Sequence, residues 1–268
     1  MIASLQEFVY RLHKRLRPDS PLPVDHDHLQ TQAAAFFGLP LDTVQQRFAE
    51  YRTLHEQKEY ARLLGESKTL CFEEAFLLFL AATIVRPQQV VEIGTQYGKS
   101  TRRIIDMLNY LGLESSVTCF DIIDAIRYVG ADEIDLQIED VTDTFTEQVL
   151  TPLSPSLIYL DAHPYHLLKN VILEYLQWSL THPSILAIHD CSPNLYAPFM
   201  WISKDDPGAI TSRTGHWERH VLAEIFKKPN NSLDTLQTNT HRLQIFGTPH
   251  GLAMIAPLTL LAHSRVEA

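Results

Sequence analysis

The sequence predicts an α/β fold with a doubly wound, mostly parallel sheet, and two observations carry this prediction. From residue 70 onward, short runs of β-branched and aliphatic residues alternate with helical segments, as in sheets built from strand–helix–strand units. The last two strand-like runs, 242–246 and 252–256, are separated by a turn too short for a helical crossover, so we expect them to be antiparallel. The sequence therefore predicts a seven-stranded sheet with one reversed edge strand.

Residues 1–69 are predicted to form a helical appendage, and residues 70–268 a separate domain. Apolar residues recur at helical spacing over residues 2–16, prolines and Gly38 end the helical segments, and Asp42 is expected to cap a long polar helix. The apolar stripe of that helix comprises Val44, Phe48, Tyr51 and Leu54. We expect the appendage to cap a binding site or to mediate homodimer formation.

The second domain is expected to contain five parallel strands, 89–93, 117–121, 135–139, 157–161 and 185–189. The apolar stretch 75–85 is about half as long as a membrane-spanning helix requires and is bracketed by charged residues, so it is expected to be a buried helix. The polar, turn-rich segment 193–215 is long for a loop in a compact domain and is predicted to be a substrate lid.

The net charge and the cysteine content limit the kinds of molecule that the protein is expected to bind and the compartment in which it is expected to lie. The chain has 268 residues, and its 22 Lys and Arg against 32 Asp and Glu give a formal net charge of −10. This charge argues against binding to nucleic acid or to an anionic membrane, and favours a small neutral or cationic molecule. The 3 cysteines include no CxxC pair, and the N-terminus lacks the continuous apolar region of a signal peptide. These features predict a cytoplasmic protein.

The segment VVEIGTQYGKST, residues 90–101, places Gly94 and Gly98 between a buried strand and a helix. Glycines let the backbone approach a ligand, and the helix N-terminus offers free N–H groups, so a nucleotide-like or carboxylate-bearing ligand is expected. A phosphate-binding P-loop needs one more residue between the glycines. A dinucleotide fold needs a glycine where Gln96 stands. S-adenosylmethionine, which has no phosphates, tolerates this turn best.

Two aspartates follow the next two strands in the order that this cofactor requires. Asp121 ends the second strand and is predicted to accept hydrogen bonds from both ribose hydroxyls. Asp140 follows the third strand and is predicted to accept from the adenine amino group. For either one alone, the alternative is a strand-end aspartate that caps the next turn.

These motifs, over residues 70–256, resemble class I S-adenosylmethionine-dependent methyltransferases with their Rossmann-like fold. The turn is similar to the ExGxxxGxS turn of small-molecule O-methyltransferases related to the caffeoyl-CoA and catechol enzymes. The resemblance implies that Glu92, Gly94, Gly98 and Ser100 line the methionine end of the cofactor. The cofactor-binding set of the turn is completed by Thr95, Gln96 and Tyr97.

A second group of polar residues follows the fourth and fifth strands, in the segments LDAH and IHD. Asp161, which is also expected to contact the cofactor, His189 and Asp190 offer the oxygen and nitrogen ligands of a divalent metal ion, which would lower the pKa of a substrate hydroxyl. Alternatively, His163 or His189 is a general base oriented by a nearby aspartate. A third interpretation is that the aspartates only cap turns.

The same segments resemble a subfamily that includes cephalosporin-hydroxylase-like and macrolide sugar O-methyltransferases. In these relatives an aspartate and an acidic pair at the matching positions bind magnesium. Here His189 replaces the first acidic residue of the pair, which disfavours magnesium and leaves manganese, another transition ion or a metal-free mechanism open. Trp201 and the cluster His216–Glu218 are candidates for an aromatic wall against the substrate, although core packing is the simpler interpretation.

The leading hypothesis is therefore an S-adenosylmethionine-dependent methyltransferase that acts on a hydroxyl group of a small molecule. Two alternatives remain at this point. A P-loop-like nucleoside triphosphatase would release phosphate in a reaction that depends on Lys99. A non-catalytic cofactor-binding protein would bind the cofactor without needing Asp161 or His189.

Overall fold

The computed structural model describes residues 23–60, 70–145, 149–150, 155–192 and 217–263. Its helices are α2 (His26–Phe37), α3 (Leu41–Lys58), α5 (Phe72–Val85), α6 (Lys99–Tyr110), α7 (Tyr165–Trp178), α8 (Glu218–Phe226), α9 (Leu258–His263) and the short 3-10 helix η3 (Asn230–Ser232). Its strands are β1 (Gln89–Ile93), β2 (Ser116–Asp121), β3 (Asp135–Ile138), β4 (Ser156–Leu160), β5 (Ser184–Ile188), β6 (Thr235–Gln237), β7 (His241–Phe246) and β8 (Leu252–Pro257).

The strands form one sheet in the order β3-β2-β1-β4-β5-β8-β7-β6. Strands β1 to β5 are parallel, and β8 runs antiparallel to both β5 and β7. The predicted doubly wound α/β class is confirmed, but over the described residues the sheet has eight strands instead of seven. The reversed strand β8 lies inside the sheet, between β5 and β7, instead of at its edge. The additional strand, β6, pairs antiparallel with β7 over three residues and forms the edge, so it is a second reversed strand.

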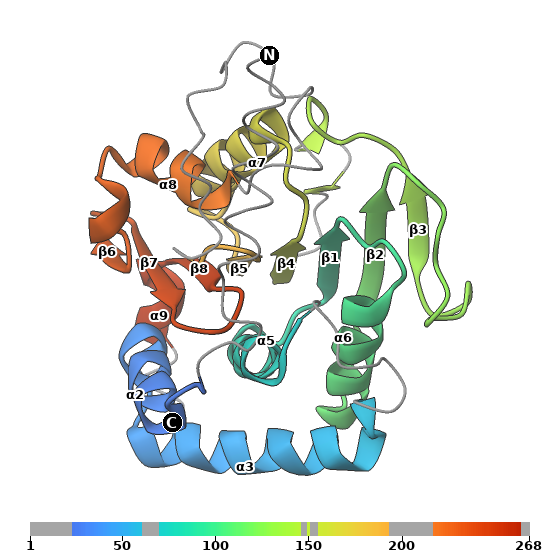
Figure 1. Ribbon diagram of the computed structural model, residues 1–268, viewed down its shortest axis with the longest axis horizontal. Coiled ribbons are helices and arrows are strands. Elements are labelled where there is room, and N and C mark those ends of the chain that lie inside the picture. Colours follow the sequence, from blue (N-terminus) through green and yellow to red (C-terminus); the bar gives the residue numbers. More distant parts are fainter. Residues whose placement is uncertain (1–22, 61–69, 146–148, 151–154, 193–216, 264–268) are drawn as a thin grey trace, which may run out of the picture.

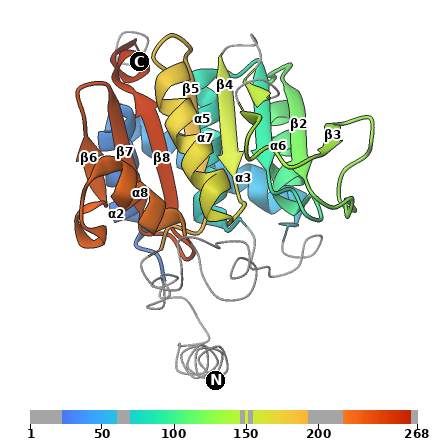
Figure 2. The same ribbon diagram turned by 90° about the horizontal axis from the view of Figure 1, so that it is seen from above.

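Helices cover both faces of this sheet. Figure 1 shows α7 and α8 on one side and α2, α3, α5 and α6 on the other, and Figure 2 shows the two layers from above. Every residue of β1, β4 and β5 is buried, because these central strands are covered on both faces. The two resulting cores are separated by the sheet.

Helices α2 and α3 share the core of α5. The predicted stripe of α3 is buried, and its Phe48 ring packs edge-on against Phe76 of α5, with ring centroids 4.9 Å apart. The side chain of Arg242 on β7 donates hydrogen bonds to the carbonyls of Ala35 and Phe36, which fixes the end of α2 against the sheet. Helix α3 begins at Leu41 without a side-chain cap, so the expected capping by Asp42 is wrong.

Several predicted segments fall outside the described residues, namely the helix over 2–16, the lid over 193–215, Trp201 and His216. The boundary between an appendage and a second domain stays a prediction. The predicted helix over 75–85 is confirmed as the buried α5. Within the described ranges, none of the helices combines the length and the apolar character needed to cross a membrane.

Candidate functional site

A cavity of about 490 Å³ lies at the carboxyl ends of β1, β2, β4 and β5. Chain order reverses between the adjacent strands β1 and β4, and ligands of doubly wound sheets bind at such reversal points. The residues that line the cavity are Gly94, Thr95, Gln96, Tyr97, Lys99, Ser100, Asp121, Ile122, Ile123, Ala125, Asp161, Ala162, His163, His189 and Asp190. The sequence-predicted groups of the glycine turn and of the later strand ends therefore meet around one cavity.

The turn after β1 depends on glycine at two positions. Gly94 has φ +90°, and a Cβ atom there would lie 2.3 Å from the carbonyl oxygen of Asp161. Gly98, with φ +79°, is the N-cap of α6. The left-handed backbone at both positions turns the chain from the strand directly into the helix, so that the first turn of α6 begins beside the cavity.

Glu92 lies beneath this turn and does not line the cavity. Its buried carboxylate accepts hydrogen bonds from the hydroxyls of Ser100 and Thr101, the latter at 2.5 Å, which ties α6 to β1. Burial raises the pKa of Glu92 to about 7, although these two hydrogen bonds act in the opposite direction. Its contacts are thus those of a carboxylate that supports the turn.

Asp121 joins two loops at the cavity. Its Oδ2 accepts from the backbone N–H of Gln96 at 2.6 Å, and its Oδ1 accepts from that of Ile123 at 3.0 Å. Each carboxylate oxygen has a second lone pair, which can accept from a ligand. Asp140 is exposed and accepts from the backbone and hydroxyl of Thr142, and like Gly98 it is not among the residues that line the cavity. Its contact with adenine stays a prediction.

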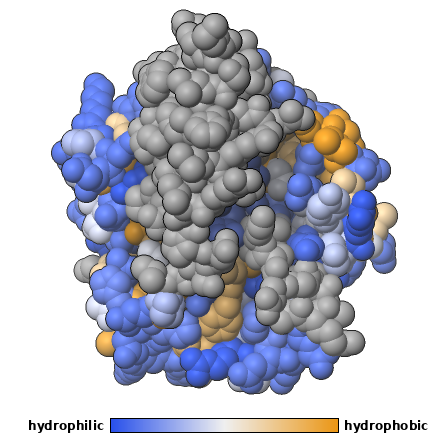
Figure 3. All heavy atoms as spheres, viewed as in Figure 1, coloured by the Kyte–Doolittle hydropathy of each residue, from blue (hydrophilic) through white to orange (hydrophobic). Residues whose placement is uncertain are grey.

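Two apolar side chains beside Asp121 escaped the sequence analysis. Ile122 and Ile123 are 71% and 62% exposed, and both line the cavity. Most of the described surface in the view of Figure 3 is hydrophilic, so apolar side chains this exposed are unusual. Thr95 also lines the cavity, and its buried hydroxyl has no hydrogen-bond partner among the described residues. The cavity therefore offers apolar and polar contacts to a ligand.

Asp161, His189 and Asp190 come together where β4 and β5 end. The Nδ1 atom of His189 lies 3.0 Å from Oδ1 of Asp161 and 3.4 Å from Oδ1 of Asp190. One ligand atom from each residue lies within 4.8 Å of the others, which is the proximity that a metal ion requires. The three residues that the sequence analysis grouped are thus neighbours.

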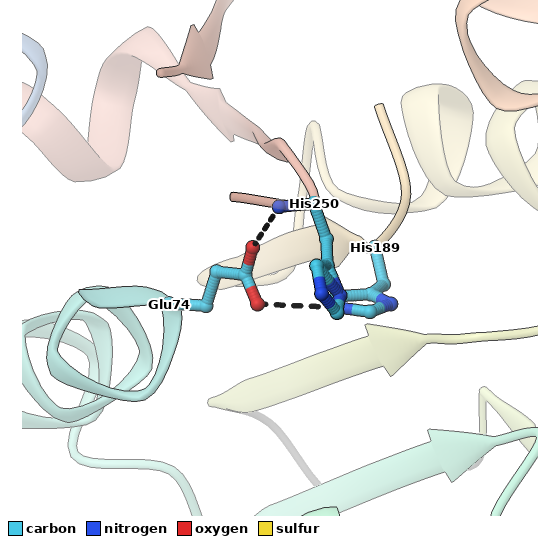
Figure 4. A group of neighbouring side chains, drawn as sticks. All are labelled: Glu74, His189 and His250. Carbon is cyan, nitrogen blue, oxygen red and sulfur yellow. Dashed lines mark hydrogen bonds and ion pairs between the residues drawn. The ribbon is translucent and has the colours of Figure 1, made fainter. Parts of the chain in front are cut away.

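The other nitrogen of His189 contacts a residue that the sequence analysis did not select. Its Nε2 lies 3.1 Å from Oε2 of Glu74, which extends from α5 across the end of the sheet (Figure 4). Glu74 is fully buried and His189 is 2% exposed. Glu74 and His189 are 115 positions apart in the sequence, so no local pattern could predict this contact.

In the buried pair of Glu74 and His189, each residue favours the charged form of the other. Burial alone would lower the pKa of His189, but the carboxylates of Asp161 and Glu74 raise it well above its usual value. Burial alone would raise the pKa of Glu74, but the hydrogen bond and charge of His189 and the charge of His250 lower it to about 2. Both ring nitrogens of His189 thus face carboxylates, an arrangement that favours the imidazolium form of the ring.

His163 is paired with the buried carboxylate of Glu218. Its Nδ1 lies 2.7 Å from Oε1 of Glu218, the residue that begins α8, and its Nε2 lies 3.8 Å from Oδ2 of Asp190. Burial opposes protonation of the ring, but Glu218 raises the pKa of His163 to about 9. Trp217 is 2% exposed and packs edge-on against Tyr165, in agreement with the core interpretation of its cluster.

Comparison with known proteins gives remote likenesses. No protein-family model matches the chain, and no curated protein matches it. A CmcI structure with Mg and SAM is 21% identical over 43% of this chain, with a TM-score of 0.37, and the match spans 52% of the CmcI chain. The SAH-bound methyltransferase PaMTH1 of Podospora anserina is 14% identical over 90% of this chain and 99% of its own, with a TM-score of 0.47.

A third solved structure, the O-methyltransferase TomG of Streptomyces achromogenes in complex with SAM, is 12% identical over 79% of this chain and 89% of its own. Its TM-score is 0.42. At this level of similarity, the assignment of a function rests on the residues of this chain.

Proposed function

We propose that the protein is an S-adenosylmethionine-dependent methyltransferase that methylates a hydroxyl group of a small molecule. The observation that carries this proposal is the cavity at the β1–β4 reversal, where the glycine turn, the carboxylate after β2 and the Asp/His groups after β4 and β5 converge. The first two groups suit the cofactor and the third suits an acceptor hydroxyl. Transfer of a methyl group mainly requires that the two reactants be held in line.

The residues present fit the cofactor. The turn from Gly94 to Tyr97 and the N-terminus of α6 would hold its amino-acid end, with the buried hydroxyl of Thr95 as an additional hydrogen-bond partner. Asp121 would accept from the ribose hydroxyls, and the exposed Ile122 and Ile123 would pack against the adenine ring. When bound, S-adenosylmethionine supplies an electrophilic methyl group on a sulfonium. The apolar and anionic surroundings of this cavity suit that cation.

The alternatives fit less well. A P-loop would use Lys99 to hold phosphates, but its Nζ lies over the ring of Tyr128, 5.4 Å from the ring centroid. The backbone of Gln96 has φ 48°, a conformation that glycine favours. In a dinucleotide site, however, its side chain would occupy the space through which the pyrophosphate must approach the backbone. A non-catalytic binding protein would have no use for the Asp161–His189–Asp190 group.

Asp161, Asp190 and the Nδ1 atom of His189 also fit a divalent metal ion, which would lower the pKa of a hydroxyl bound to it. The imidazole ligand favours manganese or another transition ion over magnesium, which prefers oxygen ligands. His163, held by Glu218, lies at the same cavity and would hydrogen-bond the acceptor oxygen. The acceptor is therefore oriented by two histidines and two aspartates of this chain.

The proposal extends to the class of acceptor, the compartment and the oligomeric state of the protein. The net charge of −10 supports a small-molecule acceptor instead of nucleic acid, and the three free cysteines agree with a cytoplasmic protein. Homodimer formation through the N-terminal helices remains part of the proposal.

The test is a thermal-shift panel of S-adenosylhomocysteine, NAD and ATP, each with and without Mn²⁺ or Mg²⁺. We expect S-adenosylhomocysteine to raise Tm and the other two to leave it unchanged. Stabilisation by ATP or NAD alone would overturn the proposal. For the reaction, formation of S-adenosylhomocysteine is followed with a panel of small hydroxylated acceptors.

A further inference from the structure

Glu74 is a fully buried carboxylate that does not line the cavity. Its Oε1 accepts from the hydroxyl of Thr248 at 2.8 Å and from the backbone N–H of His250 at 3.1 Å. Its Oε2 accepts from the backbone N–H of Cys71 at 3.0 Å and lies 3.1 Å from Nε2 of His189. Two contacts at each oxygen use all the acceptor positions of the carboxylate.

These contacts fix the hydrogen on one nitrogen of His189. Both backbone N–H groups can only donate, so the carboxylate of Glu74 acts as an acceptor at both oxygens. The Nε2 atom of His189 must therefore carry the hydrogen and donate it to Oε2. The nitrogen that remains is Nδ1, which faces Asp161 and Asp190.

This arrangement is the one by which proteins orient a metal-binding histidine. Such a histidine usually donates its second ring N–H to a carboxylate, which fixes the tautomer and the ring orientation. Once the Nδ1 proton of His189 is displaced, its lone pair lies between the carboxylates of Asp161 and Asp190.

A second grouping that could bind a metal, Glu74 with His189 and His250, is weaker. An ion there would displace donors from a carboxylate whose acceptor positions are already used, and would leave the partly buried N–H groups of Cys71 and His250 without a partner (Figure 4).

We propose that Glu74 is a positioning residue which, through the Nε2–H of His189, holds Nδ1 toward Asp161 and Asp190 and so makes this group selective for a divalent transition ion over Mg²⁺. The inference rests on the metal-assisted form of the proposed function. It adds a role for α5, whose N-terminal turn lies beside the site through Glu74.

The first experiment titrates the full-length protein with Mn²⁺ in the presence of S-adenosylhomocysteine and follows free Mn²⁺ by electron paramagnetic resonance. We expect Mg²⁺ to compete only at concentrations at least about 10-fold higher than Mn²⁺. We expect Glu74→Gln, which keeps the size of the side chain, to weaken Mn²⁺ binding by about 10- to 100-fold. Its affinity for S-adenosylhomocysteine should stay within about twofold of the parent, because Glu74 does not line the cavity.

The matched control is Glu73→Gln on the same turn of α5. Glu73 pairs with His26 at 3.0 Å instead of with His189, so this variant should bind Mn²⁺ like the parent. Equal Mn²⁺ affinity of the Glu74→Gln variant and the parent would overturn the inference, as would equal affinities of the parent for Mn²⁺ and Mg²⁺. If the parent binds S-adenosylhomocysteine but no Mn²⁺, the inference fails while the cofactor assignment stands.

A measurement on the unmodified protein keeps the inference testable if Glu74→Gln does not fold. The ring nitrogens of His189 are observed by ¹⁵N NMR after loading with Zn²⁺, which is diamagnetic. We expect the hydrogen on Nε2 and the metal on Nδ1. A hydrogen on Nδ1, or a ring unaffected by Zn²⁺, would overturn the inference.

Discussion

The Nδ1 atom of His163 lies 2.7 Å from Oε1 of Glu218, a carboxylate whose side chain is 2% exposed. The contact joins the end of β4 to the start of α8, 55 positions apart, and holds the histidine ring at the cavity. Glu218 holds the ring through Nδ1, and Nε2 faces the side of the ring where Asp190 lies, with its Oδ2 3.8 Å away, so we propose that Nε2 is the ring nitrogen that contacts an acceptor oxygen.

We therefore expect His163→Gln to lower the rate of S-adenosylhomocysteine formation by about 100-fold or more, the usual contribution of a positioned proton donor or acceptor. Glu218→Gln should act in the same direction by a smaller factor. Calorimetry should show an unchanged affinity for S-adenosylhomocysteine in both variants. Glu224→Gln is the matched control on α8, because that residue pairs with Lys169 and Tyr165 away from the cavity. Full activity of the His163→Gln variant would contradict the assigned role.

Asp121→Ala should weaken binding of S-adenosylhomocysteine by about 100-fold or more. The change removes the proposed acceptor for the ribose hydroxyls and also releases the N–H groups of Gln96 and Ile123. Isothermal titration calorimetry measures the effect, with Asp124→Ala in the same loop as control. The same affinity in the Asp121→Ala variant and the parent would refute the cofactor assignment.

Asp190→Ala should give the opposite pattern. Asp190 lies 3.4 Å from His189 Nδ1 at the proposed metal position, so its loss should impair turnover by about 100-fold or more while binding of S-adenosylhomocysteine is preserved. A chelator should lower the activity of the parent but cause no further loss in this variant. Activity that survives the chelator in the parent would favour the metal-free mechanism.

Local patterns allowed much of the fold to be predicted. Continuous apolar runs located β1, β4 and β5, since strands covered on both faces need such runs, and the glycines located the turn before α6. The strand β6 was missed because three residues with one partly buried side chain carry too little periodicity.

The partners of the two histidines could not be predicted for a different reason. Glu74 was interpreted only as a charge that flanks a buried helix, and Glu218 as part of an aromatic cluster. Which buried carboxylate meets which imidazole is decided by how α5 and α8 pack on the sheet, and the spacing of residues along the chain does not contain that information.

The pKa of Glu92 makes a final prediction about stability. Because burial raises this pKa from its usual value of 4.5 to about 7, the folded protein binds the proton more tightly than the unfolded chain does. The stabilisation of the fold by protonated Glu92 is fully present below about pH 4.5 and is lost as the pH rises through about 7. The loss lowers the free energy of unfolding by an amount on the order of 3 kcal/mol.

Urea denaturation between pH 4.5 and 8 measures this effect, by comparing Glu92→Gln with the parent. The amide cannot ionise, so the free energy of unfolding of the variant should decline less over this interval. Glu139→Gln, at an exposed position after β3, should retain the parent's decline. If the parent and the Glu92→Gln variant show the same decline, Glu92 is already ionised in the folded protein, and the hydroxyls of Ser100 and Thr101 stabilise its charge against the cost of burial.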